Sequence, residues 1–446
     1  MKQFFPFFAA VLLLAGCAVK ETPLLKIAVI SDSQAVAERN HWGMVNTDKA
    51  LKFLSSFEPD ALIIAGDLAD RTDPKIYDIY MDVFRENFPD TPPVQVACAG
   101  NHEFWSRPPI SNEIIWNDFA DGLKISRDNP SRQTVGGYDF ITFTEENSKE
   151  YHTEYSDKMI GKLKKVLDQA VARDNKKPIF LVTHYPPKKT VARSMRGRVK
   201  LRNLLNNYPQ VISLSGHTHY PIDSEKAIWQ GEFTALTTST LSYGCIGGKY
   251  RNVTNGSILP YAREVQQAMM MNIFSDRVEI HRYHIGDNNR EIKPDKVWKV
   301  AIPYDPAKAL YTDDRAKHTV PPQFPENAQM SLRHDFGFAY LLFTPARHDD
   351  LVFSYFMRAL VKNDDGKWEV VKEAEYISDF YRYQRHQTTE FSIKIPEKTL
   401  VPGKLMRFEV YAEETFGKRS KPLAIEFQTP NHWNFTKQTK QLYPQE

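Results

Sequence analysis

Cysteine is scarce in this chain, with three residues among 446. So few cysteines exclude a disulfide framework as the main source of stability. Charge of one sign is also lacking, because 58 basic residues face 55 acidic ones and leave a formal net charge of +3. This balance gives no reason to expect nucleic-acid binding, and a hydrophobic content of 41% excludes a disordered chain. The length suffices for two or three domains.

The one sustained apolar run lies at the N-terminus. Lys2 precedes an uncharged stretch over residues 3–16, which is too short to span a bilayer and is typical of a signal peptide. Small residues stand directly before Cys17, which resembles the lipobox of bacterial lipoproteins, where that cysteine carries the lipid. An ordinary secretory signal cut nearby is the alternative. We expect a signal peptide over residues 1–16, a lipidated tether over residues 17–23, and a cell-envelope protein anchored to the membrane at Cys17, on the periplasmic face or the cell surface.

Five short apolar runs, each followed by polar residues, dominate the first half of the chain. The runs predict buried strands over residues 26–30, 61–65, 94–99, 179–182 and 211–214. The polar clusters behind them are Asp32-Ser33-Gln34, Gly66-Asp67, Gly100-Asn101-His102-Glu103, Thr183-His184 and Gly216-His217-Thr218-His219. Since helical stretches alternate with these strands, we expect a mostly parallel sheet, whose carboxyl ends bind ligands. The clusters are therefore predicted to converge.

The donor types in these clusters indicate what they bind. Carboxylates, an amide oxygen and imidazoles, with no thiolate, suit a pair of divalent ions such as Mn, Fe, Zn or Mg better than a structural zinc site. Two such ions can clamp a phosphoryl group and lower the pKa of a bound water. Asp67, midway in the series, is the natural bridge between them. Any one of these residues alone would more simply be a helix cap or a turn residue.

In this order the motifs resemble the calcineurin-like metallophosphoesterases, whose pattern runs Asp-x-His, Gly-Asp, Gly-Asn-His-Glu, His and Gly-His-x-His. The resemblance covers about residues 24–290. It implies an α/β fold, a two-sheet metallophosphoesterase sandwich flanked by helices. It also implies two metal sites, one held by Asp32, Gln34, Asp67 and His219, the other by Asp67, Asn101, His184 and His217.

The same resemblance implies the catalytic groups and a phosphate-ester substrate. His102 corresponds to the histidine that acts near the leaving group, as the general acid. The segment Gly66-Asp67-Leu68-Ala69-Asp70-Arg71 also looks like its counterpart in protein serine/threonine phosphatases, which implies that Asp70 orients His102 and that Arg71 holds phosphate. A surface or cap carboxylate remains the alternative for Asp70, and a solvated cation for Arg71.

Gln34 departs from the family pattern, which has histidine there. A neutral amide oxygen is a weaker donor than imidazole toward borderline-soft ions, so a ligating Gln34 favours Mn or Mg. A glutamine that binds no metal is the alternative. Two functions follow: hydrolysis of a phosphomonoester or phosphodiester by metal-bound hydroxide, or a partly degenerate relative that binds phosphorylated glycans or lipids without turnover.

Other segments carry weaker signals. Helical spacing predicts helices over residues 46–57 and 157–173, and residues 105–132 are irregular enough to suggest a substrate lid. Residues 188–202 contain seven basic residues and no acid, which would form a cationic rim, a solvated loop or a loop that lies against anionic lipid. The spacing does not show whether Cys98 and Cys245 meet.

The second half is rich in predicted strands. Residues 232–242 and 269–285 complete the first domain, assigned to residues 24–300, and the proline-rich residues 301–325 form a linker. Alternating runs over 338–343, 351–360, 390–395, 406–412 and 423–427 predict an all-β sandwich domain over residues 326–430, before a tail over 431–446. Its ending resembles the last hairpin of fibronectin type III-like domains. The aromatic cluster at residues 380–385 could contact a glycan or simply pack.

Overall fold

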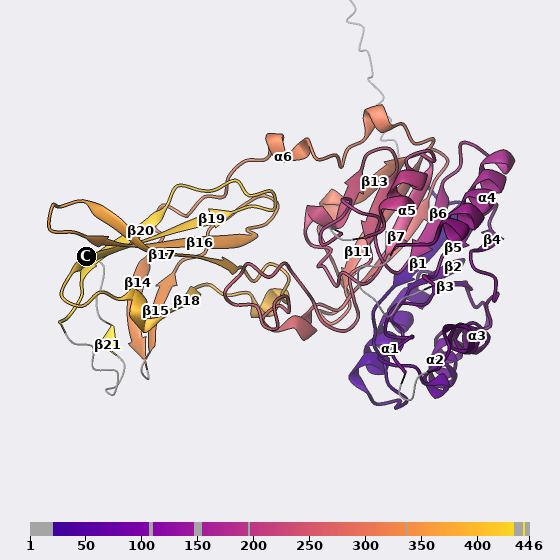
Figure 1. The fold of residues 1–446 in the computed structure, drawn as a ribbon, viewed down its shortest axis with the longest axis horizontal. Coiled ribbons are helices and arrows are strands. Elements are labelled where there is room, and N and C mark those ends of the chain that lie inside the picture. Colours follow the sequence, from indigo (N-terminus) through magenta and orange to yellow (C-terminus); the bar gives the residue numbers. More distant parts are fainter. Residues whose placement is uncertain are drawn as a thin grey trace, which may run out of the picture.

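The computed structural model describes residues 21–106, 110–146, 154–194, 197–335, 338–431 and 440–441. The predicted signal peptide and the lipidation site at Cys17 lie outside these residues. Two bodies lie side by side along the long axis of the molecule (Figure 1). Within the described ranges, helices long and apolar enough to cross a membrane are absent.

The first body contains two sheets. The first has the order β12-β11-β10-β1-β2-β3 with β13 beside β11, and the second has the order β4-β5-β6-β7-β9-β8. The first sheet consists of β1 (Leu25–Ile30), β2 (Ala61–Ala65), β3 (Val94–Cys98), β10 (Gln267–Ile273), β11 (Arg277–His284), β12 (Arg290–Glu291) and β13 (Trp298–Ala301). The second consists of β4 (Ser131–Val135), β5 (Tyr138–Thr142), β6 (Ile179–Thr183), β7 (Val211–Ser215), β8 (Ile228–Gln230) and β9 (Thr234–Thr237).

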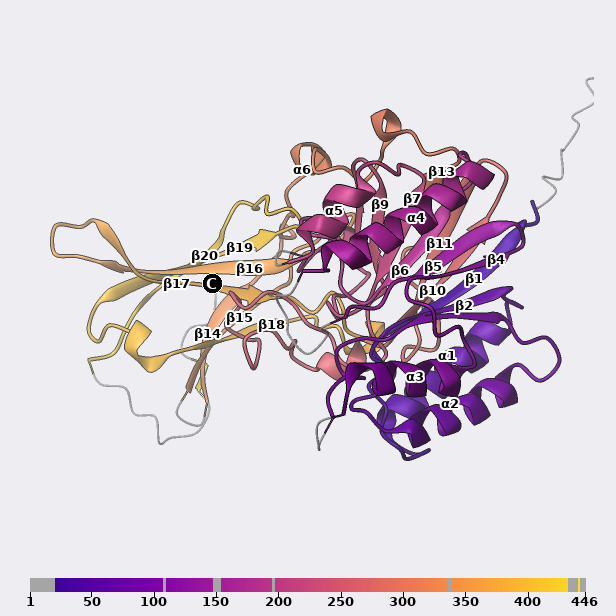
Figure 2. The ribbon, with the colours of Figure 1, turned by 45° about the vertical axis from the view of Figure 1, so that its right-hand side comes forward.

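The sheets pack face to face, with helices on both outer faces (Figure 2). Alternate residues of each strand point inward, so Val29, Ile63 and Phe180 share one core between the sheets. The opposite face of the first sheet is covered by α1 (Trp42–Ser55), α2 (Pro74–Asn87) and α3 (Asn112–Leu123). The opposite face of the second is covered by α4 (Asp157–Arg173) and α5 (Val199–Leu205).

The prediction that residues 105–132 are irregular is wrong for the middle of the segment. Helix α3 occupies the middle of this segment, capped by Ser111, whose hydroxyl accepts a hydrogen bond from Ile114 N. Its buried residues Ile115, Phe119 and Leu123 pack against the helical side of the first sheet. Residues 112–123 are therefore part of the outer helical layer.

The second body is a β-sandwich with the sheet orders β18-β15-β14-β21 and β17-β16-β19-β20. Its strands are β14 (Met330–Asp335), β15 (Phe338–Phe343), β16 (Ser354–Lys362), β17 (Trp368–Ile377), β18 (Phe391–Ile395), β19 (Leu405–Glu413), β20 (Leu423–Gln428) and β21 (Lys440–Gln441). Leu341, Met357 and Phe408 are among the residues of its core. The predicted fold class is confirmed: a two-sheet α/β sandwich flanked by helices, followed by an all-β sandwich.

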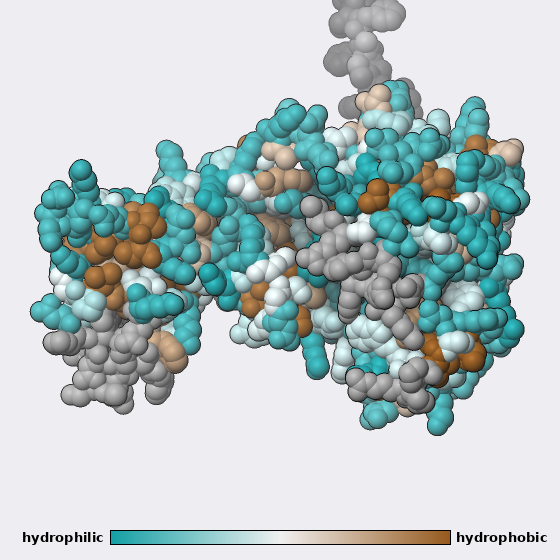
Figure 3. All heavy atoms as spheres, in the orientation of Figure 1, coloured by the Kyte–Doolittle hydropathy of each residue, from teal (hydrophilic) through white to brown (hydrophobic). Residues whose placement is uncertain are grey.

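The segment that leads from β13 to the sandwich contains the short helix α6 (Arg315–His318), and a loop of the first body contacts the second directly. Tyr250 forms a parallel bridge with Glu375 of β17, and the Asn252 side chain exchanges two 2.9 Å hydrogen bonds with the Ile377 backbone. Figure 3 shows a mostly hydrophilic surface on this face, with small hydrophobic patches over the sandwich.

The aromatic cluster at residues 380–385 lies at the contact between the two bodies. The Tyr381 hydroxyl donates to Pro260 O at 2.8 Å, and Arg382 pairs with Glu264 at 2.9 Å. Phe380 stacks on Phe353 with ring centroids 5.2 Å apart. These side chains pack the two bodies together. Of the two roles that the sequence left open for this cluster, packing or a glycan contact, the structure shows packing.

Candidate dimetal centre

The predicted ligands follow the carboxyl ends of β1, β2, β3, β6 and β7. Asp32 (φ 52°), Gln34 (φ 47°), Asp67 (φ 53°), His217 (φ 64°) and His219 (φ 48°) all have left-handed backbone conformations. Such conformations strain residues with a Cβ, and they cluster at functional sites where the surrounding structure enforces them. Here they turn successive side chains toward one edge of the two sheets.

Small residues make room for this convergence. A Cβ on Gly66 would overlap the His184 ring, and a Cβ on Gly100 would overlap the Asp67 carboxylate. Glycine is therefore required at both positions for the ligands to approach one another.

Asp32 and His219 form the first half of the site. Asp32 is fully buried, and its Oδ1 lies 3.1 Å from Nε2 of His219. Nδ1 of His219 lies 2.8 Å from the carbonyl oxygen of Tyr243, which only an Nδ1–H can satisfy as a donor. This contact turns Nε2 toward Asp32, the orientation that a shared metal ion would need.

Asp67, Asn101, His184 and His217 form the second half. Asp67 Oδ2 lies 3.2 Å from His184 Nε2. Asn101 Oδ1 lies 3.0 Å from His184 Nε2 and 3.0 Å from His217 Nδ1. Nδ1 of His184 lies 2.9 Å from Ala65 O, which directs Nε2 inward in the same way as at His219.

The two halves meet around the buried carboxylates. Ligand atoms of Asp32, Asp67 and His184 all lie within 4.8 Å of one another. Two carboxylates so close in a buried site need a cation between them, because burial and mutual repulsion both disfavour their charges. The donor set therefore fits divalent metal ions.

The ionisation of these groups supports the same view. Burial alone would raise the pKa of Asp67, but His184 and His102 outweigh it and hold that pKa well below its ordinary value. Burial opposes charge on His184 too, yet the Asp67 carboxylate raises its pKa to about 10. The His184 proton thus balances Asp67, a role that a divalent ion would take over. Burial and the neighbouring His184 lower the pKa of His217 well below its ordinary value, which keeps it neutral as a ligand must be.

Gln34 lies at the same edge, but its amide faces His102. Gln34 Nε2 is 3.1 Å from His102 Nε2, and Gln34 Oε1 accepts a hydrogen bond from the Ser242 hydroxyl at 3.1 Å. In this orientation the oxygen is engaged away from the ligand cluster. A metal-binding role would require the amide to turn over.

His102 is held between two aspartates and an aromatic ring. Its Nδ1 lies 3.0 Å from Asp70 O and 3.3 Å from Asp70 Oδ1, while its Nε2 is 3.9 Å from Asp67 Oδ2. The ring lies on Trp105, with centroids 3.9 Å apart. Burial lowers the pKa of His102, but Asp70 and Asp67 outweigh it, so that pKa is raised overall. Asp70 thus contacts His102 as the resemblance implied, whereas the Arg71 side chain is 61% exposed and lies 3.7 Å from Asp70.

Sequence reasoning missed the role of Glu103. This fully buried carboxylate accepts hydrogen bonds from the backbone N–H groups of Asp67 (3.0 Å), Ala69 (2.8 Å) and Gly100 (2.6 Å). It therefore ties the loop after β2 to the loop after β3. Burial and the nearby Asp67 raise its pKa to about 7. The fourth position of the Gly-Asn-His-Glu motif was the available signal.

Comparison with known families agrees with this geometry. Residues 25–221 match the model of the calcineurin-like phosphoesterase family. The matched segment contains every predicted ligand and all three predicted catalytic residues. No curated protein matches the chain.

Solved structures give more distant similarities. A purple acid phosphatase from yellow lupin (Lupinus luteus) is 13% identical with a TM-score of 0.42, covering 63% of this chain and 54% of that one. Vps29 of Chaetomium thermophilum is 12% identical with a TM-score of 0.26, covering 64% and 100%. A fourth FNIII domain from human is 20% identical with a TM-score of 0.15, covering 26% and 88%. The chain spans about half the length of the lupin protein.

Several described basic residues of the segment 188–202 are engaged with other parts of the first body instead of lying free on a cationic rim. Arg198 is buried, pairs with Glu145 at 2.6 Å and lies 3.5 Å above the Tyr185 ring. Arg202 lies over Trp229, and Arg193 donates to Ile246 O at 2.6 Å. Three of the seven basic residues of the predicted patch are therefore used in packing.

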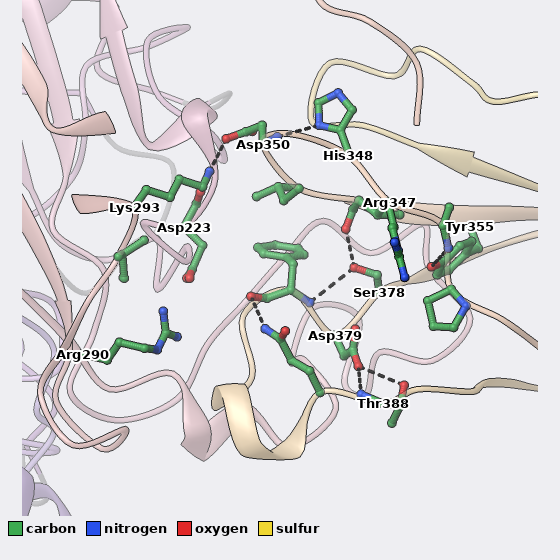
Figure 4. A pocket seen from close by; sticks show the side chains of 17 residues that line it. Asp223, Arg290, Lys293, Arg347, His348, Asp350, Tyr355, Ser378, Asp379 and Thr388 are labelled. Atoms are coloured by element: carbon green, nitrogen blue, oxygen red, sulfur yellow. Dashed lines mark hydrogen bonds and ion pairs between the residues drawn. The ribbon is translucent and has the colours of Figure 1, made fainter. Parts of the chain in front are cut away.

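A cavity of about 510 Å³ lies away from the metal centre, between the two bodies (Figure 4). None of its lining residues is a predicted ligand. Lys293 reaches across it to Asp350, Asp223 contacts His284 at 2.9 Å, and Asp379 accepts from Thr388 N at 2.7 Å. These engaged carboxylates balance the cations of the cavity, Arg290, Lys293 and Arg347.

Proposed function

We propose that this protein is a metal-dependent phosphoesterase that hydrolyses a phosphomonoester or phosphodiester. The observation that carries the proposal is the convergence of Asp32, Asp67 and His184, whose ligand atoms lie within 4.8 Å of one another in a buried site. Asn101, His217 and His219 complete a donor set with two halves. The family match over residues 25–221 supports the same chemistry.

The residues divide into ligands and a proton donor. Asp32 and His219 would hold one ion, Asn101, His184 and His217 the other, and Asp67 would bridge them. Two divalent ions would polarise the phosphoryl oxygens and supply an activated water. His102 stands beside the bridge and donates a proton to the leaving oxygen, and Asp70 keeps its ring in place and favours its protonated form.

Hydrolysis assays test this proposal. The soluble chain from residue 18 onward, stripped of metal, is given a chromogenic phosphodiester or its monoester counterpart together with Mn, Zn, Fe(II) or Mg. We expect turnover that depends on metal and that falls by at least about 100-fold in Asp67→Asn, because removal of supporting groups alone costs 10–100-fold at metal sites. Asp90→Asn, at an exposed position, is the matched control. Folded protein without turnover under any metal would refute the proposal.

One observation favours the second candidate, a relative that binds phosphorylated glycans or lipids without turnover. The Gln34 amide nitrogen faces His102 and its oxygen faces Ser242, so the first ion would have fewer ligands than the second. If Gln34→His creates hydrolysis where the natural chain has none, this candidate is favoured over the enzyme.

We further propose that the protein is exported and anchored in the cell envelope by lipid on Cys17. The apolar residues 3–16 and the small residues before Cys17 support this. Fractionation tests it: the natural chain should sediment with membranes, and Cys17→Ser should move it to the soluble or precursor fraction. Membrane association that survives the substitution would refute the lipid anchor.

A further inference from the structure

We propose that a groove at the open edge of the C-terminal sandwich binds an acidic saccharide. The groove has a volume of about 710 Å³ and lies between β15, β17 and β18, with Arg251 and Asn252 of the first body at one side. Strands β17 and β18 are the end strands of the two sandwich sheets. The groove therefore opens where the two sheets are not closed by a further strand.

Apolar and aromatic groups line the groove. Ala339, Ala374 and Ile395 are buried residues of the sandwich core, so they form an apolar floor. Phe338 and Tyr340 alternate with the core residues of β15 and therefore point outward, and Phe338 is 44% exposed. Aromatic rings at the rim of an apolar groove are suited to the C–H faces of a sugar.

The charged side chains that line the groove are all basic, and their charge is not balanced by neighbouring carboxylates. Arg251, Lys372, Lys394 and Lys398 line the groove, and no aspartate or glutamate whose side chain is described lines it. Among the described side chains, no carboxylate forms an ion pair with any of these four residues. The acids of β17 have other partners, since Glu373 pairs with Arg358 at 3.3 Å and Glu375 pairs with Lys249. The groove thus offers four cations to an anionic ligand, in contrast to the balanced cavity between the bodies.

The positions of the cations relative to the rings narrow the ligand class. Nζ of Lys394 lies 3.3 Å from the centroid of the Phe338 ring, so an acidic group bound by Lys394 would lie beside the ring face. A uronate places a carboxylate on such a sugar ring. The volume is that of a small-molecule site, which fits a short oligosaccharide, whereas single-stranded nucleic acid is followed along an extended channel.

Calorimetric titration of the chain from residue 18 onward tests the proposal. The probe is tetragalacturonate, and its fully methyl-esterified form is the uncharged control with the same rings. We expect binding of the acid and at least about tenfold weaker binding of the ester. Lys394→Glu and Lys372→Glu should each weaken binding of the acid by at least about tenfold. Lys421→Glu makes the same charge change at an exposed position outside the groove, and it should leave the affinity unchanged.

Other outcomes would overturn the proposal. Equal binding by the lysine variants would exclude this groove as the site. Tighter binding of an oligothymidylate or of phosphatidylglycerol vesicles, lost in the same variants, would assign the groove to nucleic acid or membrane instead. The groove is independent of the proposed hydrolysis, so Asp67→Asn should bind tetragalacturonate with unchanged affinity. A natural chain that binds tetragalacturonate but hydrolyses no phosphate ester would refute the proposed function and leave this proposal standing.

Discussion

The side-chain amide nitrogen of Gln34 lies 3.1 Å from Nε2 of His102. Since this nitrogen can only donate, His102 must accept at Nε2 and carry its proton on Nδ1, toward Asp70. A histidine that donates a proton from Nε2 could not keep this contact. Gln34 therefore has to turn when His102 is protonated, so that its oxygen accepts from the Nε2–H of His102.

Gln34→His should strengthen metal binding at the first half of the site. Imidazole is a better donor than an amide oxygen toward Zn, so we expect about tenfold tighter binding of the weaker of two zinc ions. Metal content after dialysis against graded chelator concentrations measures this. Gln133→His, on strand β4 and outside the site, is the control, and unchanged zinc retention would show that residue 34 does not contact metal.

Asp70→Asn should shift the pH dependence of turnover. Asp70 helps to raise the pKa of His102, so loss of its charge lowers that pKa. The protonated form that acts as acid is then lost at a lower pH, and the alkaline limb of the kcat profile should move toward acid. Asp78→Asn on the exposed side of α2 should leave the limb in place. An unmoved limb in Asp70→Asn would exclude Asp70 from this role.

Arg198→Ala should destabilise the first body strongly. Arg198 and Glu145 form a buried ion pair, and removal of one partner leaves the other charge without compensation, at a cost of about 3–5 kcal/mol. Lys200→Ala removes a nearby surface pair with Asp157 and should cost less than about 1 kcal/mol. Urea unfolding followed by fluorescence compares the two. Similar midpoints would contradict the assignment of Arg198 to packing.

The contact between the bodies should weaken in acid. Burial raises the pKa of Glu264, but Arg382, Tyr383 N and His386 outweigh it, so the pKa is lowered from its ordinary 4.5. The charged Glu264 therefore stabilises the folded protein above pH 4.5. This stabilisation is lost as the pH falls through the pKa that Glu264 has in the folded protein. Glu264→Gln should therefore lower the melting temperature at pH 6, and the difference from the natural chain should narrow by about pH 3. Glu390→Gln, at an exposed position, should show no such pattern.

Both described cysteines should be unreactive thiols in the folded protein. Cys98 and Cys245 are free and buried, and burial, together with Glu103, Asp32 and Asp67, raises the pKa of Cys98 well above its ordinary value. Because the thiolate is the reactive form, we expect a thiol reagent to modify Cys98 only after denaturation. Labelling with and without guanidinium, read by mass spectrometry, measures this. The mass of the protein should be the same with and without reductant, because both thiols are free.

Much of the site was predictable because its signals are local. A buried strand followed by Asp, Asn or His places each donor at a sheet edge, and the structure brings Asp32, Asp67, Asn101, His184, His217 and His219 to that edge. The orientation of Gln34 was not predictable, because Ser242, which holds its oxygen, is remote in sequence. The packing of Arg198 likewise depends on Glu145 and Tyr185, which lie on other segments.

The fold was predictable where the apolar residues of a segment follow one spacing, either that of a strand or that of a helix. Strand β15 and helix α4 were predicted with their observed bounds. Helix α3 was missed because the proline and asparagine residues around it outweighed the spacing of Ile115, Phe119 and Leu123. Strand β17 was missed because its exposed half carries adjacent valines and charged residues, and a register shift in its pairing with β16 interrupts the alternation.

The position of β1 within its sheet determines when the metal centre can form. Strand β1 lies between β2 and β10, and Leu25 to Val29 pair with Met269 to Ile273. A ribosome therefore completes nearly the whole first body before β1, the strand that precedes Asp32, gains its second neighbour. Until then one side of β1 is unpaired, so a chain released before residue 273 should neither capture metal stably nor resist proteases.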